Sequence, residues 1–124
     1  MSRSLAQATV GIIDDDEAVR DSLVALLTST GLSVQAYASA QEFLESREAS
    51  RVGCLIVDCQ MPDMDGLTLV DGLAARGRRV PVIVISGNCD NTTSQRARRA
   101  GAVAILEKPF SEKILFAAIR RALG

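Results

Sequence analysis

Five short apolar runs, spread over the whole length of the chain, constrain its fold more than any other feature. Each run is followed by a stretch with a helical pattern, so strands and helices are expected to alternate. The first run and the last three are nearly continuous, which is typical of parallel strands covered on both faces. Right-handed crossovers then predict a doubly wound (βα)5 domain of the α/β class, with a parallel five-stranded sheet. The expected strands are 10–13, 34–37, 54–57, 82–85 and 103–106.

The intervals between these runs carry helix signals. An S-x-x-E capping box from Ser39 to Glu42 begins the second helix, and Ser111 is placed to cap the fifth. The fourth interval, "NTTSQRARRAG", offers only Ala97 and Ala100 to a core, so its helix is predicted to be the most weakly anchored. The stripes expected to face the core in the first, third and fifth helices are Val19, Leu23, Leu26 and Leu27; Leu67, Val70, Leu73 and Ala74; and Ile114, Leu115, Ala118, Ile119 and Ala122.

Length and charge limit the classes of protein to which the chain can belong. Its 124 residues suffice for one domain and are too few for two, so 1–124 is expected to be a single domain. A formal net charge of −1 gives no electrostatic basis for binding nucleic acid or membrane. No apolar stretch approaches the ~20 residues that span a bilayer, and "MSRSLAQATV" lacks the apolar core of a signal peptide. A cytoplasmic location is expected.

Histidine and cysteine usage excludes several kinds of site. The chain has no histidine, which removes histidine general bases, histidine metal ligands and His-based triads. Its three cysteines, Cys54, Cys59 and Cys89, are odd in number and form no C-x-x-C pair. This pattern argues against a disulfide framework and a structural zinc site.

Chemically active side chains follow the expected strands at their carboxyl ends. Asp14 and Asp15 follow the first run, Asp58 the third, Ser86 the fourth and Lys108 the fifth. Parallel sheets of this class bind ligands beyond the carboxyl ends of their strands. A carboxylate at the end of a buried strand is costly to desolvate unless another group pairs with it. We therefore expect these side chains to form one site.

Their combined chemistry favours phosphoryl transfer. If the first and third strands are neighbours, Asp14 or Asp15 faces Asp58, and carboxylates this close need a cation such as Mg²⁺. The outer oxygens of a phosphoryl group carry negative charge, which the ammonium of Lys108 would neutralise and to which the hydroxyl of Ser86 would donate a hydrogen bond. Asp58 is the plausible nucleophile, since carboxylates can form aspartyl-phosphate intermediates. Each signal alone is also found in ordinary turns and helix caps; their coincidence at one edge carries the interpretation.

These residues make the chain resemble the receiver domain of two-component response regulators, within them the FixJ-like subgroup. The resemblance covers essentially the whole chain and rests on "IIDDDEAVRDSL", "VDCQMPDMDG", "VISGN" and "EKPF". It implies a flavodoxin-like (CheY-like) three-layer sandwich with strand order 2-1-3-4-5. It also implies a domain that catalyses its own Mg²⁺-dependent phosphorylation and dephosphorylation and is not a metabolic enzyme.

The resemblance also implies a role for each site residue. Asp58 would accept a phosphoryl group from a sensor histidine kinase, and Lys108 would pair with Asp58 and then with the phosphoryl group. Ser86 would sense the phosphoryl oxygen. In the family the bond corresponding to Lys108–Pro109 is typically cis. The metal ligands it implies for Mg²⁺ are Asp14, Asp15, Asp58 and the backbone carbonyl of Gln60.

Partners and output follow from the same resemblance. The first helix and the loop after the last strand would dock the kinase, and the fourth helix, last strand and fifth helix would form a phosphorylation-dependent homodimer. The output would be transcription regulation through an effector domain, although a stand-alone receiver stays open; the domain itself would bind neither nucleic acid nor membrane. One position departs from the family, because Ile105 stands where Tyr or Phe is usual. The conformational output is therefore less determined than the phosphorylation chemistry.

Three other interpretations remain as alternatives. A phosphatase of the haloacid dehalogenase kind would want an aspartate where Gln60 stands, and a longer chain. A flavodoxin-like mononucleotide binder would place its phosphate loop at Asp14 and Asp15, which repel phosphate, and no G-x-G-x-x-G or Walker motif is present. A pseudo-receiver that binds partners without phosphorylation is opposed by the intact acid set but is kept open by Ser86 and Ile105.

Overall fold

Strands and helices alternate along the chain from end to end. The computed structural model describes residues 9–47, 51–59, 66–77, 80–87 and 90–124. Each expected strand is present within one or two residues of its predicted bounds. The elements are β1 (Thr9–Ile13), α1 (Glu17–Thr28), β2 (Ser33–Tyr37), α2 (Ala40–Glu45), β3 (Val52–Asp58), α3 (Gly66–Ala75), β4 (Val82–Ser86), α4 (Asn91–Arg99), β5 (Ala104–Glu107) and α5 (Glu112–Leu123).

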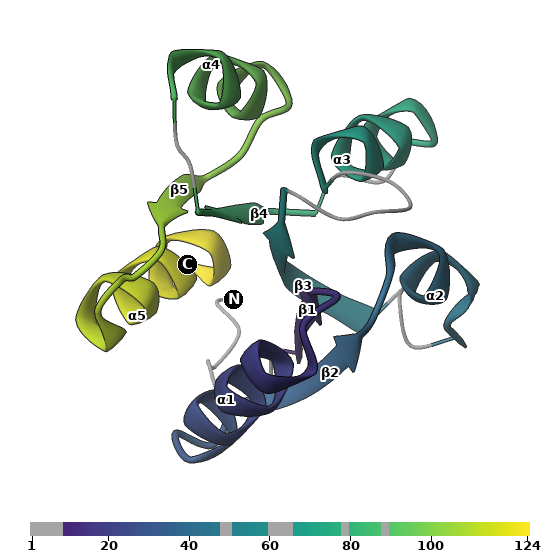
Figure 1. Ribbon diagram of the computed structural model, residues 1–124. Coiled ribbons are helices and arrows are strands. Elements are labelled where there is room, and N and C mark those ends of the chain that lie inside the picture. The colour runs from purple at the N-terminus through teal and green to yellow at the C-terminus, as the bar shows by residue number, and fades with distance from the viewer. Residues whose placement is uncertain (1–8, 48–50, 60–65, 78–79, 88–89) are drawn as a thin grey trace.

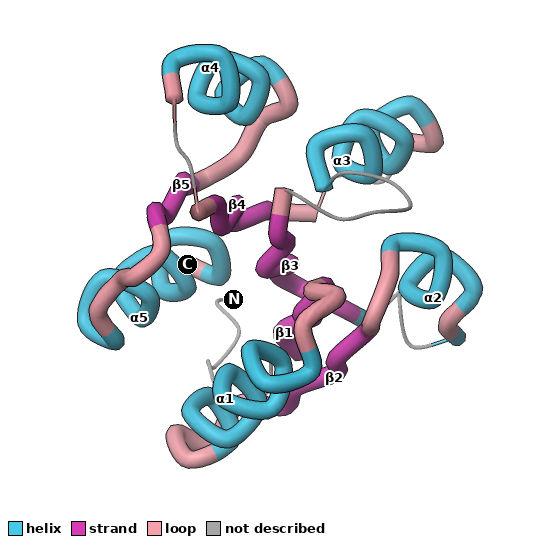
Figure 2. The backbone as a smooth tube through the Cα atoms, viewed as in Figure 1, coloured by secondary structure: helices cyan, strands magenta, loops and turns pink. Residues whose placement is uncertain are grey.

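The five strands form one parallel sheet in the order β2-β1-β3-β4-β5. Helices α1 and α5 cover one face of this sheet, and α2, α3 and α4 cover the other (Figures 1 and 2). This arrangement confirms the predicted doubly wound three-layer sandwich. Because every strand runs in the same direction, all five carboxyl ends meet at one edge of the sheet.

Two hydrophobic layers, one on each side of the sheet, hold the helices in place. Alternate residues of the strands point into opposite layers, so that Ile12 packs toward α1 and α5 while Ile13 packs toward α2 and α3. Fully buried residues fill both layers. The largest of them are Phe43, Ile12, Ile13, Leu27, Leu55, Ile56, Leu69, Ile83, Ile85, Leu115 and Ile119.

Capping side chains define where several helices begin. Asp16 accepts hydrogen bonds from the backbone N–H groups of Ala18 and Val19, at 2.9 and 3.3 Å, at the start of α1. Ser111 accepts from the N–H of Ile114 at 3.2 Å, as expected for α5. The capping box of α2 differs slightly from the expected form. Ser39 accepts from the N–H of Glu42, but the Glu42 carboxylate accepts from Ala38 instead of returning to Ser39.

Among the predicted stripe residues whose side chains the structure describes, which leave out Leu67, two do not face the core. Ile114 is 52% exposed, and Ala74 is exposed while Leu69 takes a buried position on α3. Successive helix residues are about 100° apart, so a stripe chosen from sequence can be misplaced at its margin by one residue. On α5 the buried centre is formed by Leu115, Ala118 and Ile119. Ile114 lies about 90° from that centre, at the rim of the interface.

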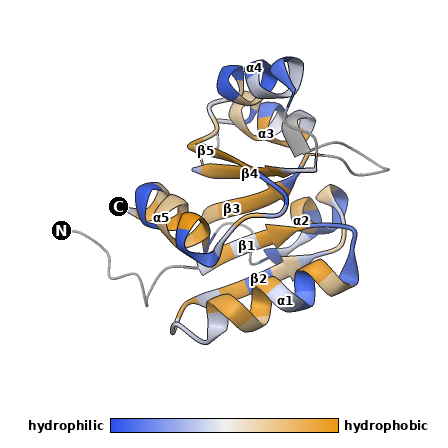
Figure 3. Cartoon of the chain, turned by 60° about the vertical axis from the view of Figure 1, so that its left-hand side comes forward, coloured by the Kyte–Doolittle hydropathy of each residue, from blue (hydrophilic) through white to orange (hydrophobic). Residues whose placement is uncertain are grey.

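The fourth helix has the sparse apolar face that the sequence predicts. Ala97 is its one buried residue, and Ala100, just after its end, packs partly against the core. Figure 3 shows α4 as the most hydrophilic of the helices, above a hydrophobic sheet. No helix among the described residues is long and apolar enough to cross a membrane.

Candidate functional site

Three aspartates meet at the carboxyl edge of the sheet. Asp58 is the last residue of β3, and Asp14 directly follows β1. The two strands pair with Ile13 opposite Val57, which brings the next residue of each strand to the same level. One carboxylate oxygen from each of Asp14, Asp15 and Asp58 lies within 4.8 Å of the others. Asp14 and Asp58 are buried, and Asp15 is exposed.

Hydrogen bonds fix Asp14 from three directions. Its N–H donates to the carbonyl of Tyr37 at 3.1 Å, and its Oδ1 accepts from the N–H of Asp16 at 2.9 Å. Its own carbonyl accepts from Arg20 Nη1 at 2.7 Å. Arg20 was missed by the sequence analysis. The available signal was a basic residue one turn into a helix that begins beside an acid run.

Lys108 lies between two of the carboxylates. Its Nζ is 3.3 Å from Asp58 Oδ2 and 3.7 Å from Asp14 Oδ2, with 31% of its side chain exposed. Its backbone N–H donates to the carbonyl of Ser86 at 2.8 Å, and its bond to Pro109 is cis, as the resemblance implied. The β5–α5 connection thus holds the ammonium against the acids.

The pKa values of this group reflect burial and mutual charge. Burial raises the pKa of Asp14, the Asp16 N–H and Lys108 oppose that rise, and repulsion from Asp58 and Asp15 adds to it; the net shift is upward. For Lys108 burial alone would lower the pKa. Attraction to Asp58 and Asp14, with hydrogen bonds to both, outweighs burial and raises it. The fold therefore makes Asp14 easier to protonate, and Lys108 harder to deprotonate, than the same groups are in water.

Ser86 and Ile105 belong to β4 and β5, the two strands that follow β3 in the sheet. Ser86 is the last residue of β4 and is fully buried. Ile85, the residue before it, pairs with Asp58 of β3, so Ser86 lies one position beyond Asp58 along the sheet edge. Ile105 pairs with Val84 on β5 and packs partly buried against the core on the side of α2–α4. Gln60, expected to offer a backbone carbonyl to the metal, lies outside the described residues.

The three carboxylates fit a hard divalent cation. Opposite oxygens in an octahedral Mg²⁺ shell are about 4.2 Å apart, since each Mg–O distance is about 2.1 Å. The 4.8 Å limit on the oxygens of Asp14, Asp15 and Asp58 comes close to that span, so small side-chain rotations would bring them around one ion. Oxygen donors without a thiol or imidazole also suit Mg²⁺ better than zinc or copper. The acid cluster can therefore bind a metal ion of this class.

Comparison with known proteins assigns the family. A family model described as "Response regulator receiver domain" matches residues 10–120. The chain belongs to this family. The receiver domain is 44% identical to the transcriptional regulatory protein FixJ of Azorhizobium caulinodans, over 93% of this chain and 54% of that protein. It is also 44% identical to the response regulator protein TodT of Pseudomonas putida, over 94% of this chain and 51% of that protein.

Solved structures agree with this assignment. A crystal structure titled FixJ-N is 42% identical and superposes with a TM-score of 0.84, covering 93% of this receiver domain and 92% of that chain. The chemotaxis protein CheY4 of Vibrio cholerae, 25% identical, gives a TM-score of 0.86 over 94% of this chain and 99% of its own. The sequence relatives and the solved structures both indicate a signalling domain like the receiver domains of FixJ and TodT. The chain spans about half the length of the curated relatives it matches.

Proposed function

We propose that Asp58 accepts a phosphoryl group from a phosphohistidine of a sensor histidine kinase. The observation that carries this proposal is the placement of Asp58, at the end of a rigid central strand, 3.3 Å from Lys108 Nζ and within 4.8 Å of two further carboxylates. A nucleophile, a fixed cation and an acid pocket are the groups that phosphoryl transfer to a carboxylate requires.

In the proposed step, a carboxylate oxygen of Asp58 attacks phosphorus as the phosphorus–nitrogen bond of the phosphohistidine breaks. The bonding electron pair returns to the imidazole nitrogen of the kinase, and an acyl phosphate forms on Asp58. Lys108, already beside the attacked carboxylate, neutralises charge on the transferred group. Ser86 supplies a hydroxyl from the adjacent strand, which donates to a phosphoryl oxygen. Hydrolysis of the acyl phosphate by water returns the domain to its resting form.

Asp14, Asp15 and Asp58 would hold Mg²⁺, together with the backbone carbonyl of Gln60. Mg²⁺ supplies charge neutralisation for the phosphoryl oxygens when it is bound. Asp14 is held in place for this role, because its backbone and carboxylate bond to Tyr37, Asp16 and Arg20.

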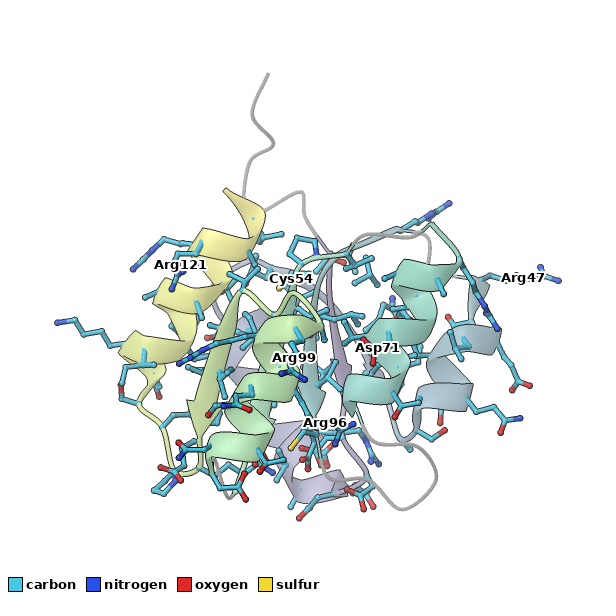
Figure 4. All side chains as sticks on the ribbon, turned by 90° about the horizontal axis from the view of Figure 1, so that it is seen from above. Arg47, Cys54, Asp71, Arg96, Arg99 and Arg121 are labelled. Atoms are coloured by element: carbon cyan, nitrogen blue, oxygen red, sulfur yellow. The ribbon has the colours of Figure 1, made fainter. Side chains whose placement is uncertain are left out.

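We assign two surfaces of the domain to protein partners, one to the sensor kinase and one to a second phosphorylated copy. The kinase would dock on α1 and the loop after β5, where a pocket of about 430 Å³ is lined by apolar residues that include Val19, Leu26 and Phe110, beside Lys108. Phosphorylated copies would pair through α4, β5 and α5. That face offers three arginines on α4, of which Arg96 and Arg99 are labelled in Figure 4, and exposed acids on or beside β5 and α5. The residues concerned are Arg96, Arg98, Arg99, Glu107 and Glu112.

The output proposed for the whole protein is regulation of transcription. FixJ of Azorhizobium caulinodans is a transcriptional regulatory protein, and its match to this chain covers 54% of its length. Residues 1–124 would then be one receiver domain that acts on an effector domain in the cytoplasm, with neither nucleic acid nor membrane bound by the receiver itself. Phosphorylation would change its conformation and its dimerisation.

Intact-mass analysis after incubation with acetyl phosphate tests the proposal. We expect one Mg²⁺-dependent phosphoryl adduct in the native chain and in Asp71→Asn, a matched change on an exposed residue of α3 (labelled in Figure 4), and none in Asp58→Asn. An adduct that persists in Asp58→Asn would mean that another residue accepts the phosphoryl group. If acetyl phosphate and a phosphorylated histidine kinase both leave the native chain unmodified, the domain is a pseudo-receiver.

A further inference from the structure

A groove of about 390 Å³ separates α5 from the turn that joins α1 to β2. Its lining residues come from α5 and the α1–β2 turn, and α1 and α5 lie on the same face of the sheet (Figure 1). It shares no lining residue with the pocket beside Lys108 and Phe110 that was assigned above to the kinase. The groove is therefore a separate feature of this face. Its lining residues are Thr30, Leu32, Lys113, Phe116, Ile119 and Arg120.

The groove has an apolar floor and a cationic rim. Leu32 and Ile119 are 8% and 1% exposed, and Phe116 is partly buried beside them. Lys113 and Arg120 are exposed, and no acidic residue is among the lining residues. Among the described residues, no carboxylate forms an ion pair with either cation. Two positive charges thus flank an apolar surface without an internal counter-charge.

The spacing of the α5 residues defines what can fit. Lys113, Phe116 and Arg120 lie at positions i, i+3 and i+7, so they form one stripe along the helix. Seven residues correspond to about 10 Å along a helix axis. An antiparallel partner helix with acids at i and i+7 and an apolar residue at i+4 presents the complementary stripe at the same spacing.

We propose that this groove docks an acidic amphipathic helix of a partner protein. The helix inserts one apolar side chain over Phe116, between the two cations, and places one carboxylate against Lys113 and another against Arg120. Electrostatic complementarity sets the register and orientation of such a helix, and the apolar side chain anchors it. The contact is independent of phosphoryl transfer to Asp58.

Two other occupants fit the groove less well. A second copy of the chain would need an acidic stripe, and none of the described helices carries acids at i and i+7. A free small molecule would find little apolar area, because the floor residues Leu32 and Ile119 are already almost fully buried. A single side chain carried by a larger partner makes better use of so small an exposed apolar area.

The test is a titration of the ¹⁵N-labelled chain with a synthetic alanine-based helical peptide that carries Glu, Leu and Glu at positions i, i+4 and i+7. Amide chemical shifts locate the contact, and fluorescence anisotropy of the labelled peptide measures affinity. A peptide with Gln in place of both Glu residues controls for the apolar contribution. Asp58→Asn provides a chain in which the proposed acceptor is absent and the groove is intact.

We expect shifts concentrated at Thr30, Leu32 and Phe116, and unchanged binding to Asp58→Asn. Lys113→Gln and Arg120→Gln should each weaken binding up to about fivefold, which is the effect expected from the loss of one exposed ion pair. The Gln peptide should bind roughly tenfold more weakly than the Glu peptide. Arg121→Gln is the matched control, because Arg121 is exposed on the same helix but does not line the groove.

Three results would overturn the proposal. Equal losses in Arg121→Gln and Arg120→Gln would mean non-specific attraction to a basic helix end. Shifts confined to the pocket beside Phe110 would place the peptide at the other surface. A dimer of the chain that dissociates in Arg120→Gln, measured by analytical ultracentrifugation, would assign the groove to a second copy.

Discussion

The ammonium of Lys108 lies 3.3 Å from Oδ2 of Asp58, although 50 positions separate the two residues in sequence. The same ammonium is 3.7 Å from Asp14, so one cation serves two buried carboxylates. Because β1, β3 and β5 deliver these three side chains to the same edge, the pairing is a direct result of the parallel sheet. It is also the contact that separates the negative charges of Asp14 and Asp58 in the metal-free protein.

Replacing Lys108 should destabilise the metal-free protein. Lys108→Gln leaves Asp14 and Asp58 facing each other without a cation, and we expect a loss of about 1–2 kcal/mol in the free energy of unfolding, below the cost of breaking a fully buried pair because the lysine is partly exposed. Urea unfolding followed by circular dichroism measures this, since the chain has no tryptophan. Lys113→Gln, on exposed α5 surface, should change stability little; equal losses in both variants would contradict the prediction.

Replacing Asp14 should have the opposite effect at neutral pH. The pKa of Asp14 is raised in the folded state, so its protonated form is favoured there and its stabilising contribution is lost as pH rises through that folded pKa. Asp14→Asn removes the buried charge while an amide oxygen still accepts from Asp16. We expect the variant to be more stable than the native chain at pH 7, with a gain in the free energy of unfolding that shrinks as the pH falls and Asp14 becomes protonated. A gain that does not depend on pH would rule out charge as its origin.

Magnesium should stabilise the native chain through the acid cluster. At a concentration ten times its dissociation constant, Mg²⁺ adds about 1.4 kcal/mol to the free energy of unfolding of a one-site protein. Asp15→Asn should lose this increment while its metal-free stability changes little, because Asp15 is exposed. Thermal unfolding with Mg²⁺ and with EDTA makes the comparison. An increment that survives in Asp15→Asn would place the metal elsewhere.

Cys54 should resist alkylation in the folded protein. Burial raises the pKa of its thiol to about 12, so almost no thiolate exists at pH 8. Incubation with iodoacetamide at that pH, followed by peptide mass analysis, should find Cys54 unmodified. The same treatment in urea should modify it fully. Modification of Cys54 in the folded chain at the denatured rate would contradict its buried position.

Two neighbouring residues of α5 should differ sharply in their effect on stability. Leu115 is fully buried and Ile114 is 52% exposed. We expect Leu115→Ala to cost about 2–5 kcal/mol through the cavity it leaves, and Ile114→Ala to cost less than about 0.5 kcal/mol, as for other surface positions. Chemical denaturation of both variants checks the helix orientation. Similar losses would mean that α5 is rotated about its axis.

Sequence patterns alone predict the order of strands and helices, the helix caps at Ser39 and Ser111, and the residues at the strand ends. Those properties are local, because apolar runs and capping side chains act through near neighbours in the chain. Because parallel strands share a carboxyl edge, Asp14, Asp58, Ser86 and Lys108 could be predicted to gather there. Gln60 lies outside the described residues, so its expected role stays a prediction.

The packing of the helices on the sheet sets which residues at the margin of a stripe are buried and which stay exposed. Leu69 is buried where Ala74 was expected to be, and Ile114 lies at the rim of its interface. Helical periodicity defines a stripe only to within about 100°, and the position of the sheet sets which residues lie at its centre. The bond from Arg20 to the carbonyl of Asp14 and the groove beside Phe116 likewise depend on how α1 and α5 lie against the sheet. Contacts between residues far apart in the chain follow from the packing of whole elements, which no local pattern encodes.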